Sequence, residues 1–175
     1  MKTSPVQMLQ LVFNKINVEH NVEHTPESAP NPLTSVFTFD GVPITTEVST
    51  VGVDTTHEHG QLYLVAMHFN VGNEHSEAKS SKVYLPYTID IDAKALVLIL
   101  QGAEKLDTPE NLATVNGASL IWSALRDQVL TLTSRMPGGP LMLPTVTFHD
   151  LRDSNGSTRK QPKAINKGRR GSTTT

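Results

Sequence analysis

The stretch that most constrains the fold is residues 117–148, in which a helical apolar pattern runs into a Pro-Gly-Gly-Pro turn. Apolar residues three and four positions apart share one face of an α-helix. Here they are Leu120, Ile121, Ala124, Leu125, Val129 and Leu132. Residues 137–140 interrupt the helix, because proline lacks the backbone N–H and glycine favours a turn. Residues 141–148 follow as an extended, largely apolar segment. This pattern predicts an amphipathic helix that closes a sheet, with an apolar segment packed beside it.

Four strands are predicted before this helix. Residues 7–20 and 82–92 carry apolar residues at alternate positions, residues 44–56 are rich in β-branched residues, and residues 61–71 are apolar throughout; the apolar run 94–101 continues the last strand. A bulge is expected near Asn14, because the apolar residues of the first strand change sides there. The third strand is apolar on both faces, so it is predicted to be central and covered on both sides. Pro86 predicts an edge position or a bulge in the fourth strand.

Two connections complete the chain. Residues 21–43 form a long irregular connection that carries three apolar residues within four positions in its middle, Val36, Phe37 and Phe39. Residues 102–116 are predicted to be a polar linker, in which Thr108 and Pro109 could open a short helix as N-cap and first residue. Strands that come before helices predict an α+β fold, with a four-stranded antiparallel sheet and helices packed on one face.

The charge distribution divides the chain into a domain at 1–148 and a tail at 149–175. The tail has seven Lys and Arg against two Asp, whereas the rest has eight basic residues against fifteen acidic ones. The tail is rich in polar residues and is expected to be disordered. Phosphates could attract it, but it has no aromatic residue for base stacking, so nucleic acid is not the expected partner.

The chain has no cysteine, which excludes a disulfide scaffold and thiolate chemistry. No apolar stretch is long enough for a transmembrane helix, and the first twenty residues show no signal-peptide pattern. We therefore expect a soluble, cytoplasmic protein that neither inserts into a membrane nor is secreted.

No pattern of catalysis or metal binding emerges. His20 and His24 lie near prolines that disfavour a shared helix face, and His57 and His59 flank Glu58 in a turn. Zinc needs three or four converging ligands, so solvated histidines are the preferred interpretation. Asp90 and Asp92 could act as an acid–base pair, but a solvated strand end fits better, and no nucleophile elbow or phosphate loop is present. We predict a protein that is not an enzyme and holds no cofactor or metal.

The end of the domain resembles the C-terminal helix and following segment of SecB-type protein-export chaperones. The residues that carry the resemblance are Trp122, Arg126-Asp127, Ser134-Arg135, Leu141-Met142-Leu143, Val146 and Phe148. Three features depart from the family: Ser123 stands where a proline is usual, Pro140 and Pro144 lie one position away from the family's prolines, and the basic tail is unusual. The order of strand, crossover loop, three strands and helix extends the resemblance over nearly all of residues 7–148.

The resemblance implies an ATP-independent chaperone that binds unfolded polypeptides, here called clients, and keeps preproteins competent for export by the Sec translocase. A client-binding groove is expected from the apolar residues of the crossover loop, the helix and the segment after it. These are Val36, Phe37, Phe39, Trp122, Leu125, Met136, Leu141 and Met142. An ordinary place in the core is the alternative for each of them.

The family also implies a homotetramer, a dimer of dimers with the long helices at the interface, and delivery of clients to the translocase motor SecA. An acidic residue on the sheet surface contributes to that docking in the family, but Tyr87 stands near its position here. Two alternatives remain open. One is a SecB-like chaperone dedicated to a specific client such as a toxin–antitoxin pair, and the other is a structural or assembly protein that binds nucleic acid through its tail.

Overall fold

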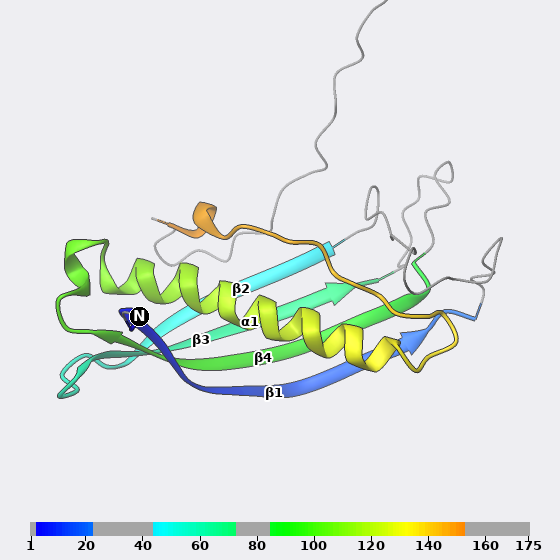
Figure 1. The fold of residues 1–175 in the computed structure, drawn as a ribbon, viewed down its shortest axis with the longest axis horizontal. Coiled ribbons are helices and arrows are strands. Elements are labelled where there is room, and N and C mark those ends of the chain that lie inside the picture. The colour runs from blue at the N-terminus through cyan, green and yellow to red at the C-terminus, as the bar shows by residue number, and fades with distance from the viewer. Residues whose placement is uncertain (1–2, 23–43, 73–84, 153–175) are drawn as a thin grey trace, which may run out of the picture.

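The four strands form one antiparallel sheet and the long helix lies across one of its faces (Figure 1). The computed structural model describes residues 3–22, 44–72 and 85–152. The elements are β1 (Val6–His20), β2 (Ile44–Asp54), β3 (Gly60–Val71), β4 (Tyr87–Leu100) and α1 (Pro109–Thr133), with two single 3-10 turns, η1 (Ala103–Lys105) and η2 (His149–Leu151). This arrangement confirms the predicted α+β fold with a four-stranded antiparallel sheet.

The sheet has the order β1-β4-β3-β2, so β1 and β2 stand at opposite edges. The chain between them must therefore cross from one edge to the other, as the predicted crossover loop does. Its residues 23–43 lie outside the described residues, and with them Val36, Phe37 and Phe39.

Strand β4 is central, which corrects the prediction of an edge or a bulge at Pro86. Pro86 lies directly before the strand, and β4 pairs with β1 from Tyr87 to Ile99 and with β3 from Ile89 to Leu100. Proline at the residue before a strand removes no ladder hydrogen bond, so it marks the start of β4 rather than a defect. The apolar run after Asp92 continues the same strand to Leu100, as predicted.

Strand β1 is irregular at two places. The register against β4 shifts between Phe13 and Lys15, which confirms the bulge expected near Asn14, and it shifts a first time between Met8 and Gln10. Each bulge inserts one extra residue and turns the following side chains to the other face. Because the parity changes at each bulge, most apolar residues of β1 stay opposite buried residues of β4: Met8 pairs with Val97, Phe13 with Ala93 and Ile16 with Ile91.

Helix α1 is longer than predicted, because it begins at Pro109 and includes residues assigned to a polar linker. Thr108 is the N-cap, and its hydroxyl accepts a hydrogen bond from the Asn111 N–H at 3.3 Å. The helix ends at Thr133, before the first proline of the turn. Helix α1 comes closest to the sheet at Gly117, because a Cβ there would lie only 2.7 Å from a methyl group of Val65.

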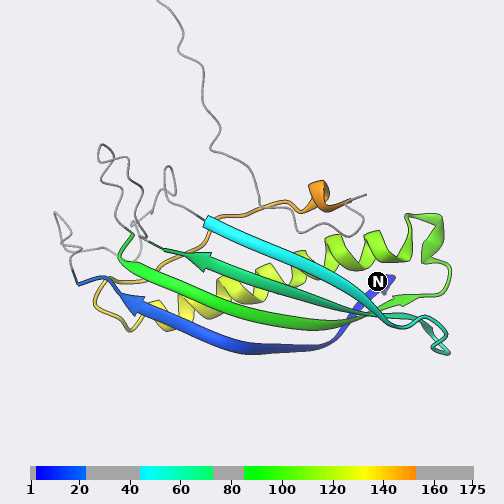
Figure 2. The same ribbon diagram turned by 180° about the vertical axis from the view of Figure 1, so that it is seen from behind.

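The core lies between α1 and one face of the sheet. Residues at alternate positions of the two central strands are buried there, and they meet the apolar stripe of α1. The opposite face is uncovered in the described ranges, as the view from behind shows (Figure 2). This corrects the prediction that β3 is covered on both sides: Leu62, Leu64 and Ala66 are only half-buried on the open face. Apolar residues on both faces of β3 therefore indicated a central position without indicating a second layer.

Acid is expected to weaken the start of α1 through Asp107. Hydrogen bonds from Asn111 and the Thr108 N–H, with the ion pair to Arg152, lower the pKa of Asp107 below its ordinary value of 3.8. A lowered pKa in the folded state adds stability above the unfolded pKa and is lost as the pH falls through the folded pKa. We expect Asp107→Ala to lower the Tm at pH 7 and the difference from wild type to shrink towards pH 3.

Thermal unfolding followed by circular dichroism at pH 7, 5 and 3 measures this. Glu104→Ala is the control, because Glu104 is an exposed acid in the neighbouring turn η1. A Tm difference for Asp107→Ala that stays constant across this range would contradict the ionic origin of the effect.

Candidate functional site

The segment after α1, residues 140–148, runs back along the helix on the side of β2 (Figures 1 and 2). We call it the strap. It belongs to no helix or strand. Leu141, Leu143 and Phe148 are buried, whereas Met142 is 56% exposed and Val146 is 40% exposed. The strap is thus an extended peptide that presents one apolar side to the body of the protein and another to solvent.

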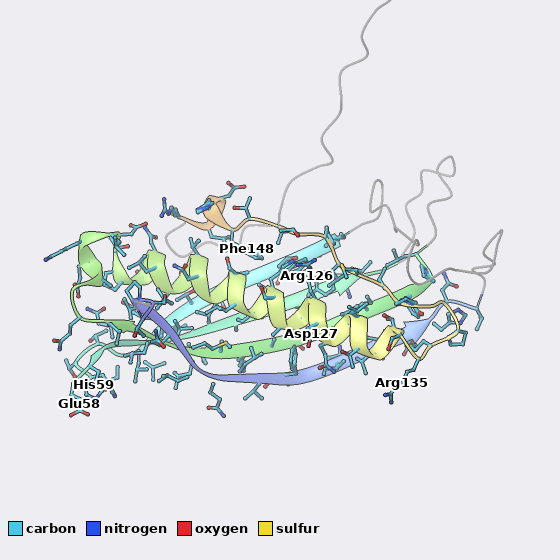
Figure 3. All side chains as sticks on the ribbon, viewed as in Figure 1. Glu58, His59, Arg126, Asp127, Arg135 and Phe148 are labelled. Carbon is cyan, nitrogen blue, oxygen red and sulfur yellow. The ribbon has the colours of Figure 1, made fainter. Side chains whose placement is uncertain are left out.

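Side chains of the body hold the strap by its backbone. The Arg126 Nε donates to the Leu143 carbonyl at 2.9 Å, and the Trp122 Nε1 donates to the Pro144 carbonyl at 3.0 Å. The hydroxyl of Thr133, itself buried, accepts from the Leu141 N–H at 2.8 Å. Arg126 and Phe148 mark the place where the strap runs beside α1 (Figure 3). Hydrogen bonds of this kind recognise an extended chain whatever its side chains are.

A fourth such bond fastens the turn that leads into the strap. The Tyr87 hydroxyl donates to the Gly139 carbonyl at 2.6 Å. Burial raises the pKa of the Tyr87 phenol, so it remains a donor at neutral pH. Gly139 has φ 76°, a left-handed conformation that favours glycine and directs the chain back along the helix.

Trp122 lies in the core under the strap. Its side chain is 4% exposed, and its ring meets Phe69 of β3 and Phe148 of the strap edge to face, with centroids 5.2 Å and 6.1 Å apart. Of the two interpretations that the sequence left open, the structure supports the core position. Aromatic pairs with this geometry contribute about 0.5–1.5 kcal/mol beyond their buried area.

The other residues of the predicted groove lie in different surroundings. Leu125 and Leu141 are fully buried, Met136 is half-buried, and Met142 is exposed on the outer side of the strap. The described members therefore do not form one open groove. An apolar pattern cannot distinguish a helix side chain that faces the sheet from one that faces a groove, since both are selected for low polarity.

The edge strand β1 carries a row of exposed apolar residues that were not among the predicted site residues. Its members are Met8, Leu9, Val12 and Ile16, each between 40% and 53% exposed. No strand within the described ranges pairs with the outer edge of β1. We call this set the β1 row. The sequence pattern that could have indicated this row is the pair of apolar neighbours at Met8-Leu9 and again at Leu11-Val12. Two adjacent apolar residues in a strand point to opposite faces, so both faces of β1 carry apolar side chains.

A polar cluster lies on the open face of the sheet. His68 pairs with Asp92 across the ladder, with 2.7 Å between Nδ1 and Oδ1, and the Lys15 ammonium lies 2.5 Å from Asp90 Oδ2. The hydrogen bond to Asp90 raises the pKa of Lys15. Asp90 and Asp92 thus stand at half-buried positions in ion pairs instead of being fully solvated at a strand end.

The ligand atoms of His68, Asp90 and Asp92 lie within 4.8 Å of one another, a spacing that a metal ion could use. Lys15 already supplies a cation to this cluster, and all three side chains are partly open to water. The arrangement therefore fits an ion-pair network better than a metal centre. Of the other histidines, His59 pairs with Glu58 in the exposed turn before β3 (Figure 3), and His24 lies outside the described residues.

No helix in the described parts of the chain is both long enough and apolar enough to cross a membrane. No protein-family model matches the sequence, and no curated protein matches it significantly.

Two solved structures have a similar course of the chain. One is the SecB-like chaperone Rv1957 of Mycobacterium tuberculosis in complex with a ChAD peptide from the Rv1956 HigA1 antitoxin. It has a TM-score of 0.45 and 17% identity over 82% of this chain and 91% of that one. The other is a protein of unknown function from Streptococcus agalactiae, with a TM-score of 0.48 and 13% identity over 80% of this chain and 97% of that one. Both likenesses are partial, and neither assigns a function to this chain.

Proposed function

We propose that this protein is an ATP-independent chaperone that holds unfolded polypeptides. The observation that carries the proposal is the β1 row, exposed apolar side chains on both faces of an edge that no described strand pairs with. Met8 and Ile16 stand opposite buried residues of β4 on the helix side, and Val12 stands opposite Lys94 on the open face. An extended client can add to such an edge as a further strand, so that its backbone forms hydrogen bonds while its apolar side chains cover the row. Edge strands without such a purpose are usually protected by charge or by a covering segment.

The chemistry of the rest of the surface agrees with a holding function. The polar cluster is held in ion pairs, and the described residues offer no phosphate-binding loop at the start of α1, which opens with Thr108 and Pro109. Binding would therefore rest on apolar contact and backbone hydrogen bonds, which need no nucleotide. Holding preproteins for the Sec translocase is the form of this function that the sequence resemblance suggests. We do not assign a SecA contact, because Asp90 and Asp92 are engaged with Lys15 and His68.

We also propose that the protein assembles as a homotetramer, as the resemblance suggests. The outward stripe of α1 is small and polar, with Ser119, Ser123, Asp127 and Thr131 exposed. A helix interface there would depend on close approach and hydrogen bonds, since the apolar stripe already faces the sheet and the strap. Multi-angle light scattering at micromolar concentration measures the mass, and a monomer would contradict this part of the proposal.

Replacing residues of the β1 row by lysine is expected to abolish most of the protein's ability to hold unfolded clients. In the variant Leu9→Lys/Ile16→Lys, two apolar contacts are lost, each contributing about 1–1.5 kcal/mol. We expect client affinity to fall about tenfold or more. The measurement is suppression of aggregation of a chemically unfolded client at near-stoichiometric ratio, with and without ATP. The control is Gln10→Lys/Asn17→Lys, which adds the same charge at exposed polar positions of the same strand.

Two outcomes would overturn the proposal. If the control loses as much holding activity as the Leu9→Lys/Ile16→Lys variant, the added positive charge, and not the loss of apolar contacts, causes the loss of activity. If the variant loses mass in light scattering along with its activity, β1 is an interface between copies of the chain. A nucleic-acid assembly protein would instead show steep salt-dependent binding that disappears when residues 153–175 are removed.

A further inference from the structure

The strap occupies a site built for an extended peptide. The body contributes three side-chain groups that bind backbone atoms of the strap, on Trp122, Arg126 and Thr133. It also contributes apolar surface for side chains two positions apart, Leu141 and Leu143, which are 0% and 1% exposed. These are the two requirements for binding unfolded polypeptide: contacts to the backbone that any sequence can make, and apolar pockets at alternate positions.

The strap is also fastened in a way that allows exchange. Residues 140–148 are in no strand, and the bonds described above tie its backbone to side chains rather than to a β-ladder. A peptide that presents the same backbone atoms and similar apolar side chains could make the same contacts. The strap is therefore equivalent to a bound peptide that happens to be covalently attached.

We infer that the site under the strap is a second client site, which the strap occupies in cis and a client segment occupies by displacing it. The inference rests on the proposed function, and it adds a ligand class and a form of regulation. The ligand is an extended segment with large aliphatic side chains at positions i and i+2 and an aromatic at i+7, the spacing of Leu141, Leu143 and Phe148.

The site differs from the β1 row in what it tolerates. Two of the three strap bonds use carbonyl groups, and the one N–H that is used belongs to Leu141. Proline directly after the second leucine position costs no bond here, as Pro144 itself shows. Strand addition at β1 needs N–H groups at regular intervals, so prolines disfavour it. The second site would accept proline-containing segments that the edge of β1 excludes.

The test uses full-length protein and a synthetic peptide with the sequence of residues 139–149. Leu143→Ala weakens the hold of the strap without changing the site beneath it. We expect this variant to bind the peptide about tenfold more tightly than wild type, because the site is open for a larger fraction of the time. Thr145→Ala is the matched control: its side chain on the strap is exposed, and peptide affinity should stay within about twofold of wild type. A peptide with serine in place of both leucines should bind neither variant.

Hydrogen exchange of the wild-type protein gives a second measurement that does not depend on the stability of Leu143→Ala. The Leu141 N–H is buried against Thr133 Oγ1, so saturating peptide should speed exchange over residues 141–148 if the strap is displaced. Unchanged or slower exchange there, with Leu143→Ala no tighter than wild type, would overturn the inference. If wild type still suppresses client aggregation in that case, only the second site fails. If no variant binds either client or peptide, the proposed function fails with it.

Discussion

Replacing Trp122 by alanine is expected to lower the free energy of unfolding by about 3–5 kcal/mol, the range for truncating a buried aromatic residue. The ring is 4% exposed and joins Phe69 of the sheet to Phe148 of the strap. Its removal leaves a cavity at the contact of three elements and also removes the indole donor to the Pro144 carbonyl. Urea unfolding followed by far-ultraviolet circular dichroism measures the change, since the chain has no other tryptophan to report it.

Two variants separate the parts of this effect. Trp122→Phe keeps an aromatic ring but loses the hydrogen bond, so a smaller loss of about 1–2 kcal/mol is expected. Ser123→Ala changes the next residue, which is exposed, and should be neutral or slightly stabilising through helix propensity. If Trp122→Ala kept its urea midpoint while losing affinity for an unfolded client, the ring would act on the binding surface and its assignment to the core would be wrong.

Gly60→Ala is expected to cost about 3 kcal/mol or more, because both strain and overlap act at this position. Gly60 has φ 154°, and a Cβ there would lie 2.0 Å from the carbonyl oxygen of Ile99 on β4. The neighbouring atom belongs to backbone, so it cannot rotate away. Strand β3 would have to separate from β4 at its first residue, where Gly60 pairs with Leu100. The measurement is again the urea midpoint.

Gly52→Ala is the matched control for this prediction. It lies in β2 near the same end of the sheet, and its added Cβ would make only ordinary contacts, 3.7 Å to Thr55 and 3.9 Å to Tyr63. A small gain is possible there, since alanine reduces the conformational entropy of the unfolded chain. Equal effects of the two substitutions would show that Gly60 is not constrained by β4.

The sequence predicted the secondary structure well where one periodicity dominates. The strand near residues 7–20 follows from alternation, those near 44–56 and 61–71 follow from β-branched and apolar residues, and the helix around residues 118–133 follows from the apolar stripe. Local chemistry also predicted the N-cap at Thr108, though the helix it opens is the long one. The predictions that failed needed knowledge of neighbours. Pro86 gave no sign that β4 would be central, because proline just before a strand and proline within one look alike in sequence.

The candidate sites depended even more on tertiary neighbours than the strands and the helix did. Trp122, Leu125 and Leu141 were recognised from the sequence as apolar residues of interest, but only packing against β3 and the strap decided that they are buried. The β1 row was missed because exposure on an edge strand depends on what lies beside it: Met8 and Ile16 pair with buried residues of β4 and are still 40% and 41% exposed. The cluster of His68 and Asp92 needed the ladder register, since the two residues are 24 positions apart.

By itself, the sequence determined the elements, their order and the mixed fold class, because alternation, helical periodicity and capping act between residues close in the chain. Only the tertiary structure decided which apolar residues are core and which are surface. Apolar side chains are driven out of water without a preferred direction, so their pattern records that they need cover but not what covers them. Here α1 covers one face of the sheet and the strap covers Trp122, while the β1 row has no cover among the described residues.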